Sequence, residues 1–189
     1  MAAFIIGILV FLVIGLVLFW VNIYNGLIML SRNVDKAWAN IDVLLKQRHD
    51  EIPKLVKVCE GYMQYERQTL EKITAARTAC IQAKSVAESA QAEGQLSGLL
   101  KTLFAVAENY PDLKANQNFL QLQQRISYLE SQIADRRELY NDSVNQYNIR
   151  INQIPDMWVA NMLKYTAKDL FKIGEEDRKD VDIKFDFPK

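Results

Sequence analysis

The sequence predicts an all-α protein, in which an N-terminal transmembrane helix is followed by an elongated antiparallel up-and-down helical bundle of three to four helices, two of them long. Three observations predict this fold. The chain opens on an uncharged apolar run, two long stretches repeat apolar residues at steps of three and four, and 7 Gly and 4 Pro are too few for a turn-rich β-sandwich. We expect the anchor over residues 1–25, the bundle over residues 26–175 and an extended tail over residues 176–189.

The composition excludes several classes of protein. The 23 basic residues are balanced by 23 acidic residues, so the net basic surface of a nucleic-acid binder is missing. Two cysteines, Cys59 and Cys80, cannot form the framework of a disulfide-rich secreted domain. A single histidine, His49, excludes a metal site built on several histidines. Half of the residues are apolar, which is enough to build a core.

The apolar run predicts a membrane-spanning helix. No charged side chain occurs from Ala2 to Ile23, and about 20 apolar residues in a helix cover the ~30 Å hydrocarbon layer. Trp20 and Tyr24 are expected at the membrane interface, where amphipathic rings prefer to lie. A cleaved signal peptide is the alternative, and it fits badly because the run is too long and no small-x-small cleavage site closes it.

The charges that flank the anchor predict its orientation. Arg32 and Lys36 follow the run closely, and no Lys or Arg precedes it. The positive-inside rule therefore places the N-terminus outside and the bundle in the cytoplasm. Gly7 and Gly15 lie two turns apart on one face, which would let two anchors approach each other, although the pattern is not GxxxG.

A stripe of mainly apolar residues predicts one very long helix from Leu27 to Cys80. Pro53 interrupts it, and because the stripe keeps its phase there we expect one kinked helix or two nearly collinear helices, and not a domain boundary. Gly61 is a second weak point. The stripe consists of Leu27, Leu30, Val34, Trp38, Ile41, Leu45, Arg48, Ile52, Leu55, Cys59, Tyr62, Glu66, Thr69, Ile73, Ala76 and Cys80.

The middle of the chain is expected to be less regular. The stretch from Ser85 to Gly98 is small and polar, which indicates a loop with the start of another helix. Leu99 to Val106 predict a short apolar helix that ends at the turn signal Asn109-Tyr110-Pro111-Asp112. Asn116 or Asn118 is expected to cap the next helix.

A second stripe predicts a long helix from Asn116 to Gln153 that Pro155 ends. Its phase needs one extra step at Arg136 or Arg137, a stutter of the kind that locally unwinds a coiled coil. The stripe consists of Phe119, Leu122, Ile126, Leu129, Ile133, Tyr140, Val144, Tyr147, Ile151 and Ile154.

Two further segments follow Pro155. A shorter helix is expected with Trp158, Met162 and Leu163 on its apolar face, to which Leu170 and Phe171 are candidate additions. The tail then alternates apolar and charged residues, and this period of two predicts an extended piece that docks one side. The apolar residues of the tail are Val181, Ile183, Phe185 and Phe187.

Catalytic chemistry finds little support in the sequence. Only the triplet His49-Asp50-Glu51 suggests acid–base work, and neighbouring helix residues point about 100° apart, so a solvated helix face is the favoured interpretation. Cys59 and Cys80 are expected as small core fillers. We expect no catalytic, cofactor-binding or metal site.

Charged and aromatic residues on the stripes admit two interpretations. The charges at Arg48, Glu66 and Arg136 or Arg137 must be paired or reach water, which favours register control or snorkelling at the bundle edge. A polar patch used by a partner is the alternative. The tyrosines are expected at the rim of the core, and they are Tyr110, Tyr128, Tyr140 and Tyr147.

Taken together, these segments resemble the LemA family from about Tyr24 to Ile154. The motif residues are expected to be structural, at packing and turn positions. They are Tyr24 and Asn25; Ala37, Trp38, Ile41, Asp42, Val43, Leu45, Arg48, Asp50, Ile52, Pro53, Leu55 and Val56; Tyr110, Pro111, Asp112 and the residues to Asn116; Phe119 and Leu122; and Tyr147 and Asn148. One departure is His49, where the family often has an aromatic residue.

The resemblance implies a single-pass protein of the bacterial inner membrane, without catalytic residues or cofactors. Some relatives take part in shaping internal bacterial membranes. The first hypothesis is therefore a non-catalytic, self-associating scaffold whose partners are the lipid bilayer and its own copies. The second is an adaptor or signalling module that binds another membrane protein such as a protease. An enzyme, such as a hydrolase that uses His49, is the third. None of these partners is a nucleic acid.

Overall fold

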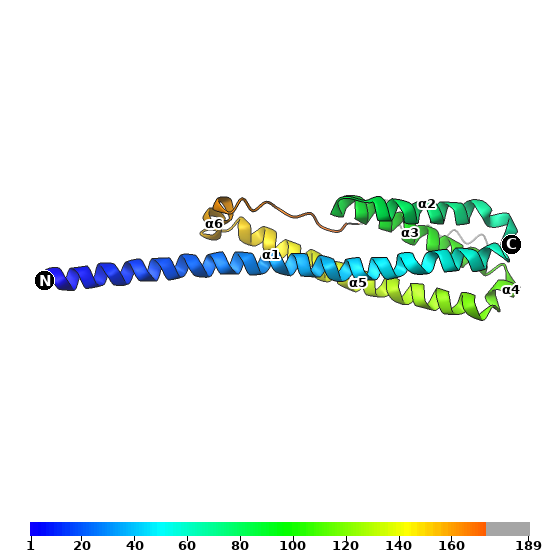
Figure 1. The fold of residues 1–189 in the computed structure, drawn as a ribbon, viewed down its shortest axis with the longest axis horizontal. Helices are drawn as coiled ribbons and strands as arrows, with labels where there is room; N and C mark the ends of the chain where they lie inside the picture. The colour runs from blue at the N-terminus through cyan, green and yellow to red at the C-terminus, as the bar shows by residue number, and fades with distance from the viewer. Residues whose placement is uncertain (173–189) are drawn as a thin grey trace, which may run out of the picture. The chain divides into compact units, whose positions relative to one another are not determined.

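The computed structural model describes residues 1–172, and within this range the chain is helical with no strand. The elements are α1 (Ala2–Glu60), the short 3-10 helix η1 (Gln64–Glu66), α2 (Arg67–Gln82), α3 (Val86–Ala107), α4 (Pro111–Lys114), α5 (Gln117–Ile151) and α6 (Asp156–Met162), as Figure 1 shows. The predicted all-α fold, with one long apolar N-terminal helix and a helical bundle region, is confirmed.

The chain divides into two compact units. Among the described residues, unit 1 consists of residues 1–45 and 132–170, and unit 2 consists of residues 46–131 and 171–172. The first part of α1 and the last part of α5 belong to unit 1, and the remaining parts of the same two helices belong to unit 2. Both units are therefore built on the same two long helices.

Helix α1 continues from the apolar run into the charged part of the chain without a break. No linker separates the apolar run from the rest of the helix, and Pro53 lies inside the helix. Side chains 1–19 are all exposed. Among residues 1–172, this is the one helix long and apolar enough to cross a membrane.

The expected continuation of the first helix to Cys80 is wrong. Helix α1 ends at Glu60, where the amides of Tyr62 and Met63 both donate to the Cys59 carbonyl at 3.0 and 2.8 Å. The chain then turns through η1 into α2, so Met63 is buried while Tyr62 is exposed. The apolar residues keep their spacing of three and four across residues 60–66, but the helix does not continue there. Gly61 weakens the helix at this point, because glycine loses more conformational freedom in a helix than other residues do.

Helix α3 begins earlier than expected, and the predicted loop from Ser85 to Gly98 is wrong. The Ser85 hydroxyl accepts from the Glu88 amide at 3.1 Å, and the Glu88 carboxylate accepts from the Lys84 amide at 2.8 Å. The first bond gives a partner to an amide that the first turn of α3 would leave without one, and the second attaches the residue before the N-cap to this turn. The small residues that suggested a loop lie on the buried face of the helix, among them Ala90 and Gly94.

The second long helix agrees with the prediction. Asn116 caps α5, because its Oδ1 accepts from the Phe119 amide at 3.1 Å, and its Nδ2 donates to the Tyr62 hydroxyl at 3.0 Å. The turn expected at Pro111 is instead the start of the short helix α4. At the stutter, Arg137 is half-buried and Arg136 is exposed.

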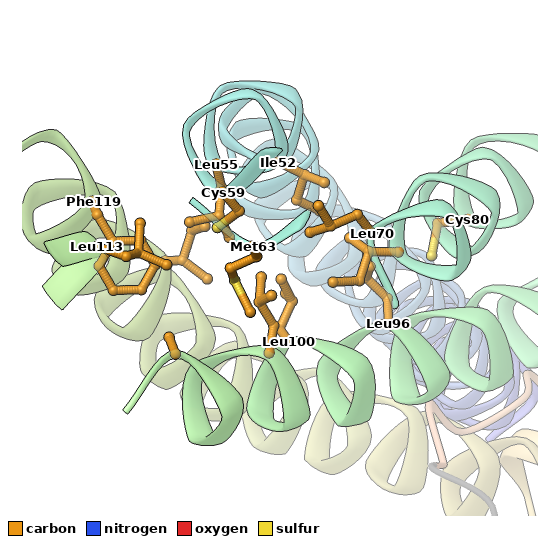
Figure 2. Close-up of a cluster of buried hydrophobic side chains, with 14 residues drawn as sticks. Ile52, Leu55, Cys59, Met63, Leu70, Cys80, Leu96, Leu100, Leu113 and Phe119 are labelled. Carbon is orange, nitrogen blue, oxygen red and sulfur yellow. The ribbon is translucent and has the colours of Figure 1, made fainter. Parts of the chain in front are cut away.

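The hydrophobic core of unit 2 joins its helices (Figure 2). Residues from α1, α2, α3, α4 and α5 contribute to it, so the fold of this unit depends on contacts between segments far apart in sequence. The core consists of Ile52, Leu55, Cys59, Met63, Leu70, Ile73, Cys80, Leu96, Leu100, Leu103, Ala107, Leu113, Phe119 and Ile126.

The face predicted for the helix after Pro155 is wrong. Helix α6 buries Val159 and Ala160, while Trp158 and Met162 are exposed. Leu170 and Phe171 follow in a non-helical segment, and Ile154, expected on the second stripe, is exposed beyond the end of α5. The tail prediction of residues 176–189, with Val181, Ile183, Phe185 and Phe187, lies outside the described residues.

Candidate functional site

A cluster of buried charged side chains lies in unit 2, around Arg48 on α1. Glu93 and Ser97 on α3 are four residues apart, which places them on one face of that helix. Glu130 is supplied by α5. The Arg48 side chain is only 1% exposed, so its charge has to be balanced within the protein.

Arg48 connects three helices through its guanidinium group. It forms ion pairs with Glu93 and Glu130, and its Nη1 donates to Ser97 Oγ at 2.8 Å. The Ser97 hydroxyl lies 3.0 Å from Glu130 Oε2 and donates to this carboxylate. The expected snorkelling of Arg48 to the bundle edge is therefore wrong. Its charge is paired inside the protein, with Glu93 and Glu130.

His49 is part of the same cluster, and its predicted place on a solvated helix face is wrong. The residue is buried, and its Nε2 lies 2.9 Å from Glu93 Oε1. Burial alone would raise the pKa of Glu93, but His49 and Arg48 outweigh it and lower this pKa below its ordinary value.

Pro53 explains a second contact of His49. A proline has no amide hydrogen, so the carbonyl four residues earlier, that of His49, lacks its helical donor. Arg77 on α2 supplies the missing donor, with its Nε 2.7 Å from the His49 carbonyl oxygen. The family-motif proline thus creates a site on α1 to which α2 is attached.

Cys80 completes a group that sequence reasoning missed. One ligand atom each from His49, Cys80 and Glu93 lie within 4.8 Å of one another, and all three residues are buried. Nitrogen, sulfur and carboxylate oxygen are the donors that zinc prefers. Cys80 is 31 residues after His49, and Glu93 is 13 residues after Cys80. Metal sites are recognised in a sequence by short ligand spacings, so these separations gave no signal.

The surroundings of this group fit a metal ion poorly. His49 and Glu93 already contact each other, and Arg48 would place a second positive charge beside any cation held by Glu93. Burial raises the pKa of the Cys80 thiol to about 12, with a further increase from Glu93, whereas a zinc ligand or a nucleophile has to be a thiolate. The arrangement favours a closed structural cluster over a reactive centre.

Cys59, the other cysteine, has no charged group among the causes that shift its pKa. Burial raises the pKa of its thiol to about 12, and the residue lies in the core of unit 2. It contributes as a small apolar side chain.

A second set of polar contacts lies in unit 1, where two motif residues of α5 hold an extended segment. Asn148 Nδ2 donates to the Lys168 carbonyl and Asn148 Oδ1 accepts from the Lys168 amide, both at 2.9 Å. The neighbouring Tyr147 hydroxyl donates to the Thr166 carbonyl at 3.1 Å. We call residues 164–170 the strap, because these side chains bind its backbone as a partner strand would.

The strap is also tied to α1. Lys168 Nζ donates to Asp35 Oδ1 at 2.6 Å and lies 5.4 Å from the centre of the Tyr147 ring. The Tyr140 hydroxyl donates to the Asp169 carbonyl at 2.9 Å, and the Tyr140 ring lies 5.5 Å from that of Trp38. Burial raises the pKa values of Tyr140 and Tyr147, so both hydroxyls remain donors at neutral pH.

The remaining residues singled out from the sequence are spread over the molecule. Ile41 is fully buried, Trp20 and Tyr110 are half-buried, and Tyr128 is exposed. The exposed motif residues are Tyr24, Asn25, Asp42, Val43, Asp50, Pro53, Pro111, Asp112, Lys114 and Ala115. The motif positions therefore do not converge on one cleft: Arg48 lies in unit 2, while Tyr147 and Asn148 lie in unit 1.

The sequence profile of the LemA family matches residues 37–185. The chain belongs to the LemA family. Protein LemA of Metamycoplasma hominis is 30% identical over 176 residues, which cover 90% of this chain and 79% of that protein. The LemA resemblance inferred from the motifs is thus confirmed, and the match begins one residue before Trp38.

Two magnetosome proteins are also similar to this LemA-family chain. Magnetosome proteins MamQ 2 and MamQ 1 of Paramagnetospirillum magneticum are each 22% identical over 175 residues, which cover 79% of this chain. The chain spans 64% of the length of each of them.

Proposed function

We propose that this LemA-family chain is a non-catalytic, membrane-anchored scaffold that associates with copies of itself. The observation that carries the proposal is the continuity of α1: its exposed apolar residues 2–19 are joined without a linker to two packed helical units. An exposed apolar surface of this size in a helix requires lipid or protein around it. Residues 1–25 then form the anchor and residues 26–175 the bundle.

The interface residues and the orientation follow from the same proposal. Trp20 and Tyr24 lie at the boundary of the bilayer, where their rings contact both lipid and water. The positive charges of Arg32 and Lys36 after the apolar run support an orientation with the bundle in the cytoplasm of a bacterial cell and the N-terminus outside.

The buried polar groups support a structural role over a catalytic one. In unit 2, the charges of Arg48, Glu93 and Glu130 are directed at one another, His49 contacts Glu93, and burial raises the pKa of the Cys80 thiol. A hydrolase that uses His49 would need a nucleophile of lowered pKa and access for a substrate. The raised pKa of Cys80 opposes the first requirement, and the burial of His49, Cys80 and Glu93 opposes the second.

Labelling of introduced cysteines tests the orientation. Cys59 and Cys80 are buried, so a membrane-impermeant maleimide reports on a new, exposed cysteine. Lys84→Cys is expected to react only after the cells are opened, and Ala3→Cys is expected to react in intact cells with a permeable outer layer. The reverse pattern would place the bundle outside.

The mass of the full chain in detergent tests self-association. Light scattering after size exclusion should give a protein mass above that of the 21.8 kDa monomer, and dilution should lower it. A monomer mass at every concentration, with helicity retained, would contradict the scaffold proposal.

An adaptor that binds another membrane protein is the second candidate, and one surface favours it. An open groove of about 640 Å³ lies between α1 and α2 in unit 2. Its lining mixes apolar and charged side chains, among them Val56, Leu70, Arg67 and Glu71. Ala75→Arg would fill this groove. Loss of a specific co-purifying protein from this variant, but not from Lys101→Arg on the exposed part of α3, would favour the adaptor.

A further inference from the structure

Helix α6 exposes large apolar side chains although it is packed on unit 1. Its buried side is formed by Val159 and Ala160. Trp158 is 53% exposed and Met162 is 69% exposed, and Ile154, just before the helix, is 70% exposed. Trp158 and Met162 are four residues apart within α6, which places them on one side of the helix, and Ile154 lies in the turn that leads into it. A water-exposed side with this composition requires a partner.

The contacts within unit 1 fix the level of α6 along α1. The Trp38 ring contacts the Tyr140 ring, and Lys168 joins Tyr147 to Asp35 and to the Ser31 carbonyl, 3.4 Å away. Later residues of α5 therefore lie beside earlier residues of α1, as in any antiparallel pair.

Continuation of this register places Ile151, the last residue of α5, at the level of Leu27. The next turn then lies at the level of Ile23. These three residues are all buried, as such a pairing requires. Helix α6 starts five residues after Ile151, at the end of α5 that is directed toward the N-terminal half of α1 (Figure 1).

The same level is the boundary of the apolar segment of α1. All side chains from 1 to 19 are exposed, Asn22 is the first strongly polar residue, and packing against the rest of unit 1 begins at Ile23. If α1 spans the bilayer, the surface of the membrane passes close to Trp20 and Tyr24. Helix α6 and its exposed apolar side chains then lie at this surface.

We propose that α6 is an interfacial membrane contact: Trp158, Met162 and Ile154 insert into the headgroup region of the leaflet from which α1 emerges. The proposal rests on the proposed function, because it requires α1 to be in the membrane. Tryptophan prefers this depth, since its ring is apolar and its N–H can bond water or headgroups. The contact gives the rigid unit a second attachment to the bilayer beside the anchor, which fixes the rotation of α1.

The charges next to α6 agree with a lipid surface. Arg150 is partly exposed and pairs with Asp156 at 2.9 Å, and Lys164 is exposed directly after the helix. Basic side chains that flank an apolar face are attracted to anionic headgroups. A lipid surface thus accounts for both the apolar and the basic residues of this end of unit 1.

Tryptophan fluorescence tests the proposal in the full chain. The protein has Trp20, Trp38 and Trp158, so two matched variants each retain one reporter outside the core: Trp38→Phe with Trp20→Phe leaves Trp158, and Trp38→Phe with Trp158→Phe leaves Trp20. Both are placed in nanodiscs of phosphatidylcholine and phosphatidylglycerol. The quenchers are lipids brominated at shallow or deep acyl positions and, from the aqueous side, iodide.

We expect lipids brominated at shallow positions to quench Trp158 more strongly than lipids brominated at deep positions. We also expect its emission maximum at a shorter wavelength than that of the unfolded protein in urea without detergent. Quenching of Trp158 by iodide alone overturns the proposal. Protection from both quenchers that disappears on dilution of the protein among nanodiscs also overturns it, because a second copy then covers α6.

The Trp20 variant separates this outcome from failure of the anchor. If brominated lipid quenches Trp20 but not Trp158, only the interfacial contact is wrong; if it quenches neither, the membrane-anchor proposal fails as well. Should Trp38→Phe unfold the protein, Met162→Cys with an environment-sensitive label gives the same readout, because both native cysteines are buried.

Discussion

Unit 1 and unit 2 share the same two long helices but are held together by different chemistry. In unit 2, charged side chains from three helices meet around Arg48 in the interior. In unit 1, buried tyrosine side chains and a half-buried asparagine side chain of α5 bind the backbone of the strap. A helix bundle can thus be fixed either by mutual neutralisation of buried charges or by side chains that stand in for a missing backbone partner.

The difference has a consequence for robustness. Removal of one member of a buried charge cluster leaves its partners charged and without compensation, which costs far more than the loss of one contact. The strap is held at several points, so the loss of one hydrogen bond leaves the others. Unit 2 should therefore be the more sensitive of the two to single substitutions of polar residues.

The largest effect is expected for Arg48→Met. The substitution leaves Glu93 and Glu130 without their guanidinium, and it should lower the free energy of unfolding by about 3–5 kcal/mol. Urea unfolding in detergent, followed by circular dichroism, measures the change. The matched control is Arg67→Met, which removes an exposed ion pair with Glu71 and should cost less than about 1 kcal/mol. Equal effects of the two variants would remove the distinction between buried and exposed charges.

Asn148→Ala tests the other side of the comparison. It removes both hydrogen bonds to Lys168, and a loss of about 1–3 kcal/mol is expected. Hydrogen exchange should show faster exchange of the Lys168 amide, with no change at the amides of α3. The exposed neighbour Asn145→Ala serves as control. Faster exchange throughout unit 2 would mean that the strap stabilises more than the unit to which it belongs.

A smaller effect is expected from the pair Pro53 and Arg77. Arg77→Met should cost about 1 kcal/mol, because the His49 carbonyl loses its donor. In a Pro53→Ala background the helix amide of residue 53 is restored, so the same substitution should cost less. A double-mutant cycle gives the coupling directly. Equal costs in the two backgrounds would show that Arg77 does not replace the missing amide.

Glu93 should make the stability of unit 2 depend on pH in the acid range. The folded protein lowers the pKa of Glu93, so below its ordinary value of 4.5 the unfolded chain binds more protons than the folded one. The stability that Glu93 contributes is present above about pH 4.5 and is lost as the pH falls through the folded pKa. The Glu93→Gln variant should be less stable at pH 7, and its free energy of unfolding should fall less steeply as the pH is lowered below about 4.5. An unchanged slope in this pH range would assign the acid sensitivity to other carboxyl groups.

Periodicity predicted the long helices but not their partners. The steps of three and four gave α5 from Asn116 onward and showed Arg48 on a buried face, because both depend on local spacing alone. Glu93 and Glu130 are 45 and 82 residues from Arg48, and no local pattern connects them. His49 was missed because it flanks the stripe, where α3 happens to bring a carboxylate.

Two errors had signals in the sequence. The start of α3 is marked by Ser85 and Glu88, three residues apart, which is the pattern of a helix cap. The end of α1 is marked by Gly61, a weak position for a helix, although the stripe of apolar residues continues past it. The exposure of Trp158 on α6 had no such signal, because it depends on where the end of α5 lies along α1.

The central claim is that α1 anchors this LemA-family chain in a bilayer. The most direct measurement is the distribution of the full chain after membranes are washed with alkaline carbonate, which releases proteins bound only at the surface. The account predicts that the chain remains with the membrane pellet and is extracted only by detergent. Release of the folded chain into the carbonate supernatant would contradict it.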